Sequence, residues 1–220
     1  MIPDRSFRHP LGERLVAAAG GAFPPADGEV EVVPPYLPGV EAVVALTGHA
    51  VVATTLSRAR LLGCGADGFG GATLPAVVLA LAGPGGEIDT LDVLLVARGT
   101  GTTELPELPV AEAAGHPRVA HSLRWRERVR VFADDRGLVT LTAGVGGLPE
   151  LAFEVEPRLR GQGRGRALLA DALGLVPERT PVLAAVAPGN AASLRTVLAS
   201  GFVPVGSVQL VRPGPDRTRG

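Results

Sequence analysis

Residues 150–169 read "ELAFEVEPRLRGQGRGRALL", which predicts a strand, a glycine-rich turn and the start of a helix in one continuous run. Apolar side chains at alternating positions share one face of the predicted strand: Leu151, Phe153 and Val155. Three glycines at every second position follow: Gly161, Gly163 and Gly165. Because glycine has no Cβ atom, a bulky ligand can approach this backbone closely.

The chemistry of this turn points to an anion. The first N–H groups of a helix have no partner within the helix, and the helix dipole favours negative charge at that end. Arginines surround the glycines: Arg160, Arg164 and Arg166. A P-loop is excluded because the chain has no lysine, and the dinucleotide fingerprint is excluded because Arg166 stands where its last glycine belongs. An ordinary strand–helix connection and a nucleic-acid-binding arginine–glycine segment are the competing interpretations.

The elements around the turn form a recognisable order. Strands are expected at 128–134, 138–145, 150–156, 181–187 and 202–211, and a helix at about 165–174. A further helix is expected to begin after Asn190 as its N-cap and to end at Gly201. The strand–turn–helix–strand order is a βαβ unit, so the strands 150–156 and 181–187 are predicted to be parallel neighbours.

Two motifs in this order resemble the GNAT superfamily of acetyl-CoA-dependent N-acetyltransferases. "VEPRLRGQGRGRALL" (155–169) is similar to the family's pyrophosphate-binding motif, and "APGNAASLRTVLASGFVPVG" (187–206) is similar to its later Asn-to-Gly-Phe helix. The resemblance covers about residues 128–211. It implies an α/β (α+β) fold with a mixed, splayed central sheet flanked by helices. The first 120 residues would add an α+β accessory or acceptor-recognition region.

The resemblance also implies a site. Acetyl-CoA, or another short acyl-CoA, would be the co-substrate, with no metal. The residues expected to bind it are Phe153, Val155, Arg160, Gly161, Gln162, Gly163, Arg164, Gly165, Arg166, Asn190 and Ser193. Weaker candidates for the acceptor amine are Trp125, Arg128 and Tyr36. For Trp125, core packing is the competing interpretation.

Catalysis on an amine needs a base, because only a neutral amine attacks a carbonyl. The candidates are Glu150, Glu154 and Glu156, of which Glu150 is nearest to the family's usual base position; solvated strand residues or arginine partners are the alternative. The position where the family commonly carries an acidic Tyr is Val197, which donates no proton. The general acid is then missing, replaced by water or Ser193, or supplied by the N-terminal part of the chain. The second hypothesis is therefore a non-catalytic acyl-CoA-binding relic that acts as a regulatory or partner-binding module.

The N-terminal half carries no assignable motif. A helix near 12–23, a Pro-rich connection, a hairpin over 40–56, a short helix over 72–83 and a strand over 87–99 are expected. Residues 100–117 are predicted to be a linker. The expected domains are 1–120, a core of 121–212 and a loose tail of 213–220. A degenerate copy of the core fold within 1–120 is a further hypothesis.

Composition limits the class of protein. Residues 1–103 hold 6 Arg and 10 acidic residues, a net charge of −4, whereas residues 121–220 hold 14 Arg and 9 acidic residues, a net charge of +5. Such a basic half attracts phosphates. The single cysteine, Cys64, excludes an intramolecular disulfide. We expect a cytoplasmic monomer or homodimer that acts on a small amine or peptide and binds neither nucleic acid nor membrane.

Overall fold

The computed structural model describes residues 9–217, and its contacts divide the chain into two compact units. The first unit contains the chain up to Val93, Val145–Gly147 and the chain from Val205 on; the second contains Leu94–Gly144 and Leu148–Pro204. The expected boundary at residue 120 differs from this division. Residues 94–120 belong with the second unit because they supply two of its strands and the two helices α4 (Val110–Ala113) and α5 (Pro117–Trp125).

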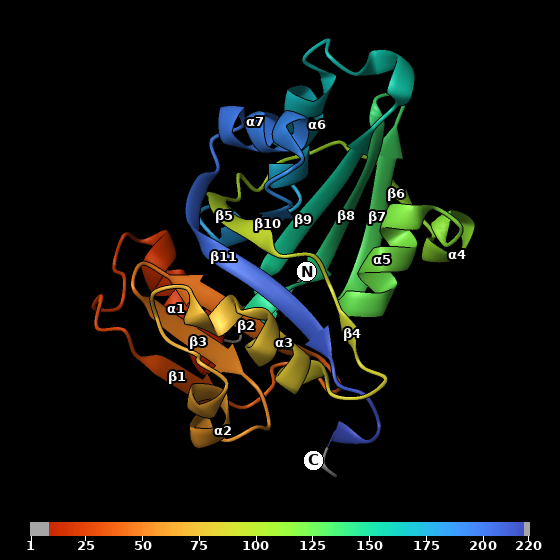
Figure 1. The fold of residues 1–220 in the computed structure, drawn as a ribbon. Helices are drawn as coiled ribbons and strands as arrows, with labels where there is room; N and C mark the ends of the chain where they lie inside the picture. The colour runs from red at the N-terminus through yellow and green to blue at the C-terminus, as the bar shows by residue number, and fades with distance from the viewer. Residues whose placement is uncertain (1–8, 218–220) are drawn as a thin grey trace. The chain divides into compact units, whose positions relative to one another are not determined.

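The second unit is built on a mixed sheet with the strand order β5-β10-β9-β8-β7-β6 (Figure 1). Its strands are β5 (Asp92–Arg98), β6 (Glu107–Leu108), β7 (Glu127–Asp134), β8 (Gly137–Ala143), β9 (Pro149–Val155) and β10 (Pro181–Val186). β7, β8 and β9 form an antiparallel meander, and β10 is parallel to β9 as the sequence predicts. The predicted mixed sheet flanked by helices is therefore confirmed.

The turn between β7 and β8 explains why the meander closes where it does. The Asp134 carboxylate accepts the backbone N–H of Arg136, a local bond that favours a tight turn. Gly137 follows with a φ of 151°, and a Cβ atom there would lie 2.0 Å from the carbonyl oxygen of Glu154. Glycine is thus required for β8 to begin against the end of β9.

β9 is fully paired on one side only. All seven of its residues are in register with β8, from Pro149 opposite Ala143 to Val155 opposite Gly137. On its other side, the register with β10 consists of one pair, Leu183 opposite Glu150. The two parallel strands therefore part beyond Glu150, and within residues 9–217 no strand is in register with the edge of β9 from Leu151 to Val155.

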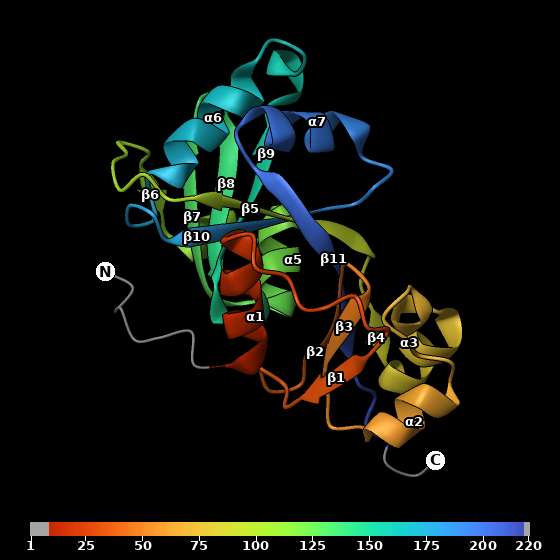
Figure 2. The same cartoon turned by 90° about the vertical axis from the view of Figure 1, so that its left-hand side faces the viewer.

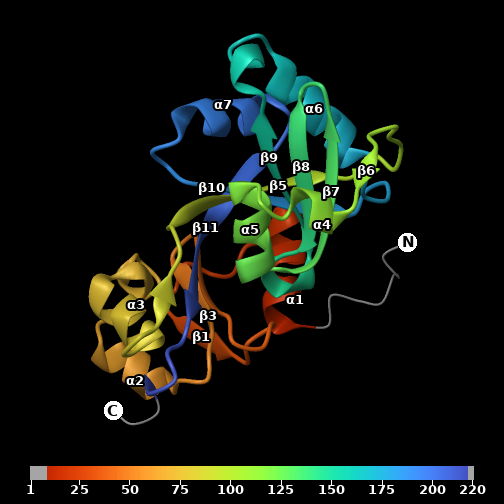
Figure 3. The same ribbon diagram turned by 90° about the vertical axis from the view of Figure 1, so that its right-hand side faces the viewer.

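Helices cover both faces of this sheet. α5 packs against β7, β8 and β9 on one face, as Figure 3 shows. α6 (Arg164–Leu173) packs on the other, where its buried residues Leu168, Leu169, Ala172 and Leu173 form the predicted apolar stripe. α7 (Ala191–Ala199) lies beside α6 (Figure 2). Asn190 caps α7 through its side chain, and Gly201, with a φ of 87°, follows its end.

The first unit has a sheet with the strand order β1-β3-β2-β11, and β4 pairs with β11. The strands are β1 (Val30–Val33), β2 (Glu41–Leu46), β3 (His49–Ala53), β4 (Glu87–Ile88) and β11 (Val203–Arg212), and the helices are α1 (Pro10–Ala19), α2 (Arg58–Gly63) and α3 (Pro75–Ala82). The hairpin and α3 were predicted; β1, inside the expected Pro-rich connection, and α2 were not. β1, β2 and β3 stay paired along their lengths, so this unit lacks the parted strands that a degenerate copy of the core requires.

The expected loose tail is ordered as far as Arg217. The backbone N–H of Gly214 donates to the carbonyl of Ala82, and the buried guanidinium of Arg217 forms an ion pair with Glu41 at 2.5 Å. The tail prediction is wrong for 213–217, because burial of a carboxylate requires a cationic partner. Residues 218–220 lie outside the described residues. No helix between residues 9 and 217 has the length and apolar character needed to span a bilayer.

Candidate functional site

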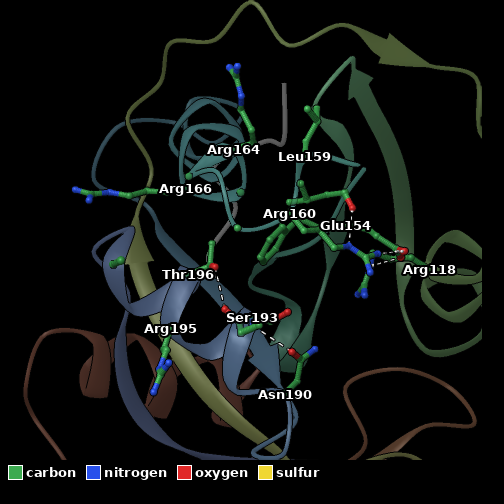
Figure 4. Close-up of a pocket in the computed structure, with 17 residues that line it drawn as sticks. Arg118, Glu154, Leu159, Arg160, Arg164, Arg166, Asn190, Ser193, Arg195 and Thr196 are labelled. Carbon is green, nitrogen blue, oxygen red and sulfur yellow. Dashed lines mark hydrogen bonds and ion pairs between the residues drawn. The ribbon is translucent and has the colours of Figure 1, made fainter. Parts of the chain in front are cut away.

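A pocket of about 540 Å³ lies in the second unit (Figure 4). Three segments form it: the end of β9 with Phe153 and Val155, the turn into α6, and the face of α7 that contains Ser193 and Thr196. Arg118 of α5 completes the wall. Its volume falls in the range of small-molecule sites, about 300–1,000 Å³. Most of the residues that the sequence singles out for ligand binding therefore line one cavity.

The turn into α6 leaves a row of backbone donors unused. Within the described chain, the N–H groups of residues 161–165 make no hydrogen bond, and the first bonded N–H is that of Arg166, which donates to the carbonyl of Gly163 at 3.1 Å. No side chain caps α6. Residues 161–164 are exposed and Gly165 is buried, so most of this row of donors lies at the surface. An anion at this helix N-terminus would receive both the free donors and the helix dipole.

The three glycines of the turn are needed for two different structural reasons. Gly161 and Gly163 have φ values of 76° and 75°, a region that residues with a Cβ atom rarely adopt. Gly165 is different: a Cβ atom there would lie 3.0 Å from Val155 Cγ2 and 3.1 Å from Thr196 Cγ2. The first two glycines shape the open turn, and the third lets α6 approach the strand and α7 closely.

The direction of the backbone groups along β9 shows which residues present the unpaired edge. Glu156 donates its N–H to the carbonyl of Arg136, and the carbonyl of Glu154 faces Gly137, so both backbone groups point toward β8. The direction of the backbone N–H and C=O groups alternates along a strand, so the N–H and C=O groups of Phe153 and Val155 point away from β8. They face the side on which β10 has parted. An extended ligand could add to this edge as a strand would.

Helix α7 supplies the opposite wall. The Asn190 side chain accepts the backbone N–H of Ser193 at 3.1 Å, which fixes the start of the helix. Ser193 and Thr196 lie three residues apart and so face the same side. Figure 4 shows Ser193 next to Asn190 and Thr196 farther along the helix, where Thr196 donates its hydroxyl to the carbonyl of Ala192. Val197 is fully buried, so the position of the family's acidic Tyr holds a core residue here.

Positive charge rims the pocket. Of its five arginines, three have no ion-pair partner among residues 9–217: Arg164, Arg166 and Arg195. All three are exposed. Arginine binds phosphate oxygens through two parallel N–H donors, so this rim suits a ligand that carries several phosphates.

The other two arginines share one carboxylate. Glu154 lies 3.3 Å from the guanidinium of Arg160 and 3.6 Å from that of Arg118, and His116 lies at 4.0 Å. Figure 4 shows Arg118, Glu154 and Arg160 gathered on one side of the pocket. Arg160 also donates its Nε to the carbonyl of Val155 at 3.1 Å. Glu154 is thus the one predicted carboxylate that lines the pocket, and it is surrounded by cations.

Glu150 has a different environment. It lies where β9 and β10 part, and it is 6% exposed. Its two oxygens accept from Arg126 at 2.6 and 3.0 Å, and the Arg126 side chain is equally buried. This buried bidentate ion pair directs the carboxylate at Arg126 rather than at the pocket. The residue placed nearest the family's base position is therefore a partner of an arginine.

The remaining predicted residues lie elsewhere. Glu156 is exposed and does not line the pocket, and Gln162 donates its side-chain amide to the carbonyl of Arg158. Trp125 is 5% exposed on α5, which fits core packing. Arg128 is an exposed residue with a φ of 52° at an irregularity in β7. Tyr36 belongs to the first unit, where its ring meets that of His9 edge to face.

An ion-pair bridge fixes α6 to the sheet. Arg136, in the β7–β8 turn, lies 2.5 Å from Asp134 and 2.6 Å from Asp171 of α6. The hydrogen bond to Asp134, assisted by Asp171, raises the pKa of Arg136 above its ordinary value although burial opposes this. For Asp134, burial favours the neutral form, but its bonds to Arg136 outweigh burial and lower the pKa. The bridge ties the C-terminal half of α6 to the β7–β8 turn.

Six residues that line the pocket were not predicted from the sequence: Arg118, Leu159, Ala192, Arg195, Thr196 and Ala199. Thr196 follows Ser193 by three residues, the spacing of one helix face, so the 3.6-residue period could have identified it. Arg195 lies two residues after Ser193, and this period does not place it on the same face. Arg118 had no such signal. It belongs to α5, which lies in sequence between the predicted linker and the first predicted strand, and only the tertiary packing of α5 brings it to Glu154.

Comparisons with known proteins give likenesses of fold. No known sequence family and no curated protein matches the chain. A GNAT-family acetyltransferase structure from Colwellia psychrerythraea matches 57% of this chain and 57% of its own, with 12% identity and a TM-score of 0.35. A GCN5-related N-acetyltransferase from Kribbella flavida matches 61% and 63%, with 19% identity and a TM-score of 0.34.

A conserved protein of unknown function from Staphylococcus epidermidis matches 58% of this chain and 62% of its own, with 18% identity and a TM-score of 0.39. The chain thus spans less than two thirds of each of these three structures. At these identities and TM-scores, what this chain binds and does must be inferred from the geometry of its own pocket.

Proposed function

We propose that the second unit binds a coenzyme A thioester and transfers its short acyl group, acetyl in the simplest case, to an amine. The observation that carries this proposal is the row of free backbone N–H groups at residues 161–165, adjacent to the unpaired edge of β9. The first feature suits a diphosphate and the second suits an extended arm with amide groups. Coenzyme A contains both, joined in that order.

The proposed binding assigns a task to each wall. The free donors of the turn would hold the diphosphate, with Arg164, Arg166 and Arg195 adding charge. The backbone groups of Phe153 and Val155 would bond the pantetheine arm on the edge of β9, opposite Asn190 and Ser193. When bound, the thioester supplies an activated acyl carbonyl. Glycine at 161 and 163 keeps this surface free of side chains.

The proposed reaction requires two proton transfers. The attacking amine must lose a proton, and the departing thiolate must gain one. Glu154 is the carboxylate that lines the pocket, whereas Glu150 is held by Arg126. Ser193 lines the pocket, and its hydroxyl could protonate the thiolate. It would take the role of the family's Tyr, whose position is occupied here by Val197. We propose Glu154 and Ser193 for these tasks, or water ordered by them.

A second candidate function is binding of an acyl-CoA without turnover. Two observations favour it: the buried Val197 and the engagement of Glu150 by Arg126. Such a protein would use the same pocket to sense an acyl-CoA. The two functions share the ligand and differ only in thiol release.

The test has two stages. Acetyl-CoA at saturation is expected to raise the midpoint of thermal unfolding and to give a binding isotherm in calorimetry. Gly163→Glu is expected to lower the affinity about 100-fold and so to reduce the thermal shift at a given concentration. Release of free thiol in the presence of grouped amines then distinguishes transfer from binding alone. If acetyl-CoA neither binds nor stabilises the wild-type protein, both candidate functions are wrong. If it binds but no amine class yields thiol, the binding function stands.

A further inference from the structure

Arg160 occupies the position that the ligand needs. Its Nε donates to the carbonyl of Val155 at 3.1 Å, and its terminal nitrogen lies 3.3 Å from Glu154. The Val155 carbonyl points to the open side of β9, because Glu154 and Glu156 direct their backbone groups to β8. Within the described chain, Arg160 is therefore the group that satisfies the free edge of the strand at its pocket end.

The same residue stands at the start of the anion-binding turn. Arg160 is followed directly by Gly161, and it is the C-cap of a short 3₁₀ turn over Pro157–Leu159. Its side chain is 57% exposed, so a modest movement can carry the guanidinium from the strand edge toward the turn. A diphosphate bound on the turn would attract this guanidinium more strongly than a neutral carbonyl does.

We infer that Arg160 is a displaceable plug that couples the two halves of the ligand. In the free protein it closes the edge of β9 at Val155. When a diphosphate binds on the turn, Arg160 moves to the phosphates, and the Val155 carbonyl is released for the pantetheine arm. Each half of the ligand thereby favours the other, since the first to bind removes the cost of moving Arg160.

Glu154 keeps other partners when Arg160 moves away from it. After Arg160 leaves, the Glu154 carboxylate keeps Arg118 as a partner at 3.6 Å and His116 at 4.0 Å, so it is not left alone near the incoming phosphates. The buried Nε of Arg118 makes no hydrogen bond within residues 9–217, and a closer approach to Glu154 would satisfy it. Arg118 is therefore a positioning residue for this exchange.

The inference rests on the proposed binding of coenzyme A, and fragments of that molecule test it separately. The probes are pantetheine, which has no phosphate, and 3′-phosphoadenosine 5′-diphosphate, which has no arm. In the wild-type protein, saturating nucleotide is expected to raise the affinity for pantetheine about two- to fivefold, the value of an exposed charged contact. Ligand-observed NMR measures pantetheine, and calorimetry measures the nucleotide.

Arg160→Met removes the plug and keeps an unbranched side chain of similar length. It is expected to raise the affinity for pantetheine alone by the same two- to fivefold, to lower the affinity for the nucleotide, and to abolish the coupling between them. Arg166→Met is the matched control: it removes an exposed arginine of the same pocket that has no acidic partner in the described chain. The control is expected to weaken nucleotide binding and to leave pantetheine binding unchanged.

A second measurement decides the matter if pantetheine binds too weakly to quantify. The Arg160 Nε–H signal, assigned by its loss in Arg160→Met, is expected to shift when the nucleotide alone is added. Weaker or unchanged pantetheine binding in Arg160→Met, or an Nε–H signal that does not move with nucleotide, overturns the inference while binding of coenzyme A still stands. Failure of coenzyme A, nucleotide and pantetheine to bind overturns the proposed function itself.

Discussion

Two strand-to-helix turns in this molecule use the same elements in opposite ways. In the second unit, β9 leads into α6 through a turn whose N–H groups at 161–165 are free. In the first unit, β3 leads into α2 through Thr54–Ser57, and the N–H groups of Thr54, Thr55 and Leu56 are bonded. The carboxylate of Glu41 accepts the N–H of Thr55 at 3.0 Å and the hydroxyl of Thr54 at 2.6 Å.

The first unit closes its turn with a buried carboxylate of its own. Glu41 is 2% exposed, and the guanidinium of Arg217 bonds both of its oxygens and the carbonyl of Leu81. Ser57 caps α2 by accepting the N–H of Arg60. The internal carboxylate takes the place that an external anion would have. The same element order thus gives two turns that differ in how many of their donors are satisfied, and the proposed function predicts binding at the open one alone.

The largest expected effect is on the free energy of unfolding, and it comes from the turn over residues 54–57. Glu41→Gln leaves Arg217 buried without its countercharge, and breaking a buried ion pair costs roughly 3–5 kcal/mol in the free energy of unfolding. Chemical denaturation measures this loss. The double variant Glu41→Gln, Arg217→Met is expected to recover much of it. A single variant that unfolds at the same denaturant concentration as wild type would contradict the structural role of the pair.

Gly163→Glu places a carboxylate on the open turn, and its effect on the affinity for acetyl-CoA is expected to be the next largest. A charge about 5 Å from a bound diphosphate costs about 3 kcal/mol at an effective dielectric constant of about 20, so the affinity for acetyl-CoA is expected to fall about 100-fold. Calorimetry measures it.

Gly21→Glu is the matched control for this substitution. Gly21 has a φ of 84° and open space around its Cβ position, as Gly163 has, but it does not line the pocket. Both variants carry the same charge and a similar backbone strain. An equal loss of binding in the two variants would show that the charge acts through stability rather than at the turn.

Arginines at the two turns are expected to differ by a smaller amount. Arg166→Ala removes a cation of the open turn, and acetyl-CoA affinity should fall about two- to fivefold with a weaker dependence on salt. Arg58→Ala, at the start of α2, removes a cation that pairs with Glu29 and should leave affinity unchanged. Binding measured at two salt concentrations separates the variants. Identical salt dependence in wild type and Arg166→Ala would exclude a phosphate near Arg166.

The smallest effect concerns the bridge that holds α6. Because the pKa of Asp134 is lowered in the folded state, its contribution to stability is complete above its ordinary pKa of 3.8 and is lost as the pH falls through the folded value. Asp134→Asn is expected to cost at most about 1 kcal/mol at neutral pH. The difference from wild type should shrink below about pH 4. Denaturation at both pH values measures it, and a constant difference would exclude the carboxylate charge as its cause.

Much of the second unit could be predicted because its signals are local. Alternation in "ELAFEVE", glycines in the turn and an Asn cap each act within a few residues, and they place β9, α6 and α7 within one or two residues of the observed bounds. The parted strands and the open turn follow from the resemblance. The ion pairs around the site could not be predicted in this way. The pairs of Arg126 with Glu150 and of Arg118 with Glu154 depend on how α5 packs.

The first unit was predicted less well for a related reason. β1 joins its sheet by pairing in parallel with β3, about twenty residues away, so the sequence "VEVV" between prolines and glycines carries no local sign of its partner. Arg217 meets Glu41 across 176 positions. Pairings of that kind depend on the whole fold, and a chain that is rich in Gly, Ala and Val gives few distinctive side chains to reveal them.

The separation of β10 from β9 after Glu150 also has a cost for the protein without ligand. A break inside a sheet exposes the same unsatisfied backbone groups as an outer strand does, and such groups invite addition of a strand from another polypeptide. A molecule laid along Phe153 and Val155 would seal the break. During concentration or storage, a filled pocket should therefore delay self-association of this chain, quite apart from any chemistry that the pocket performs.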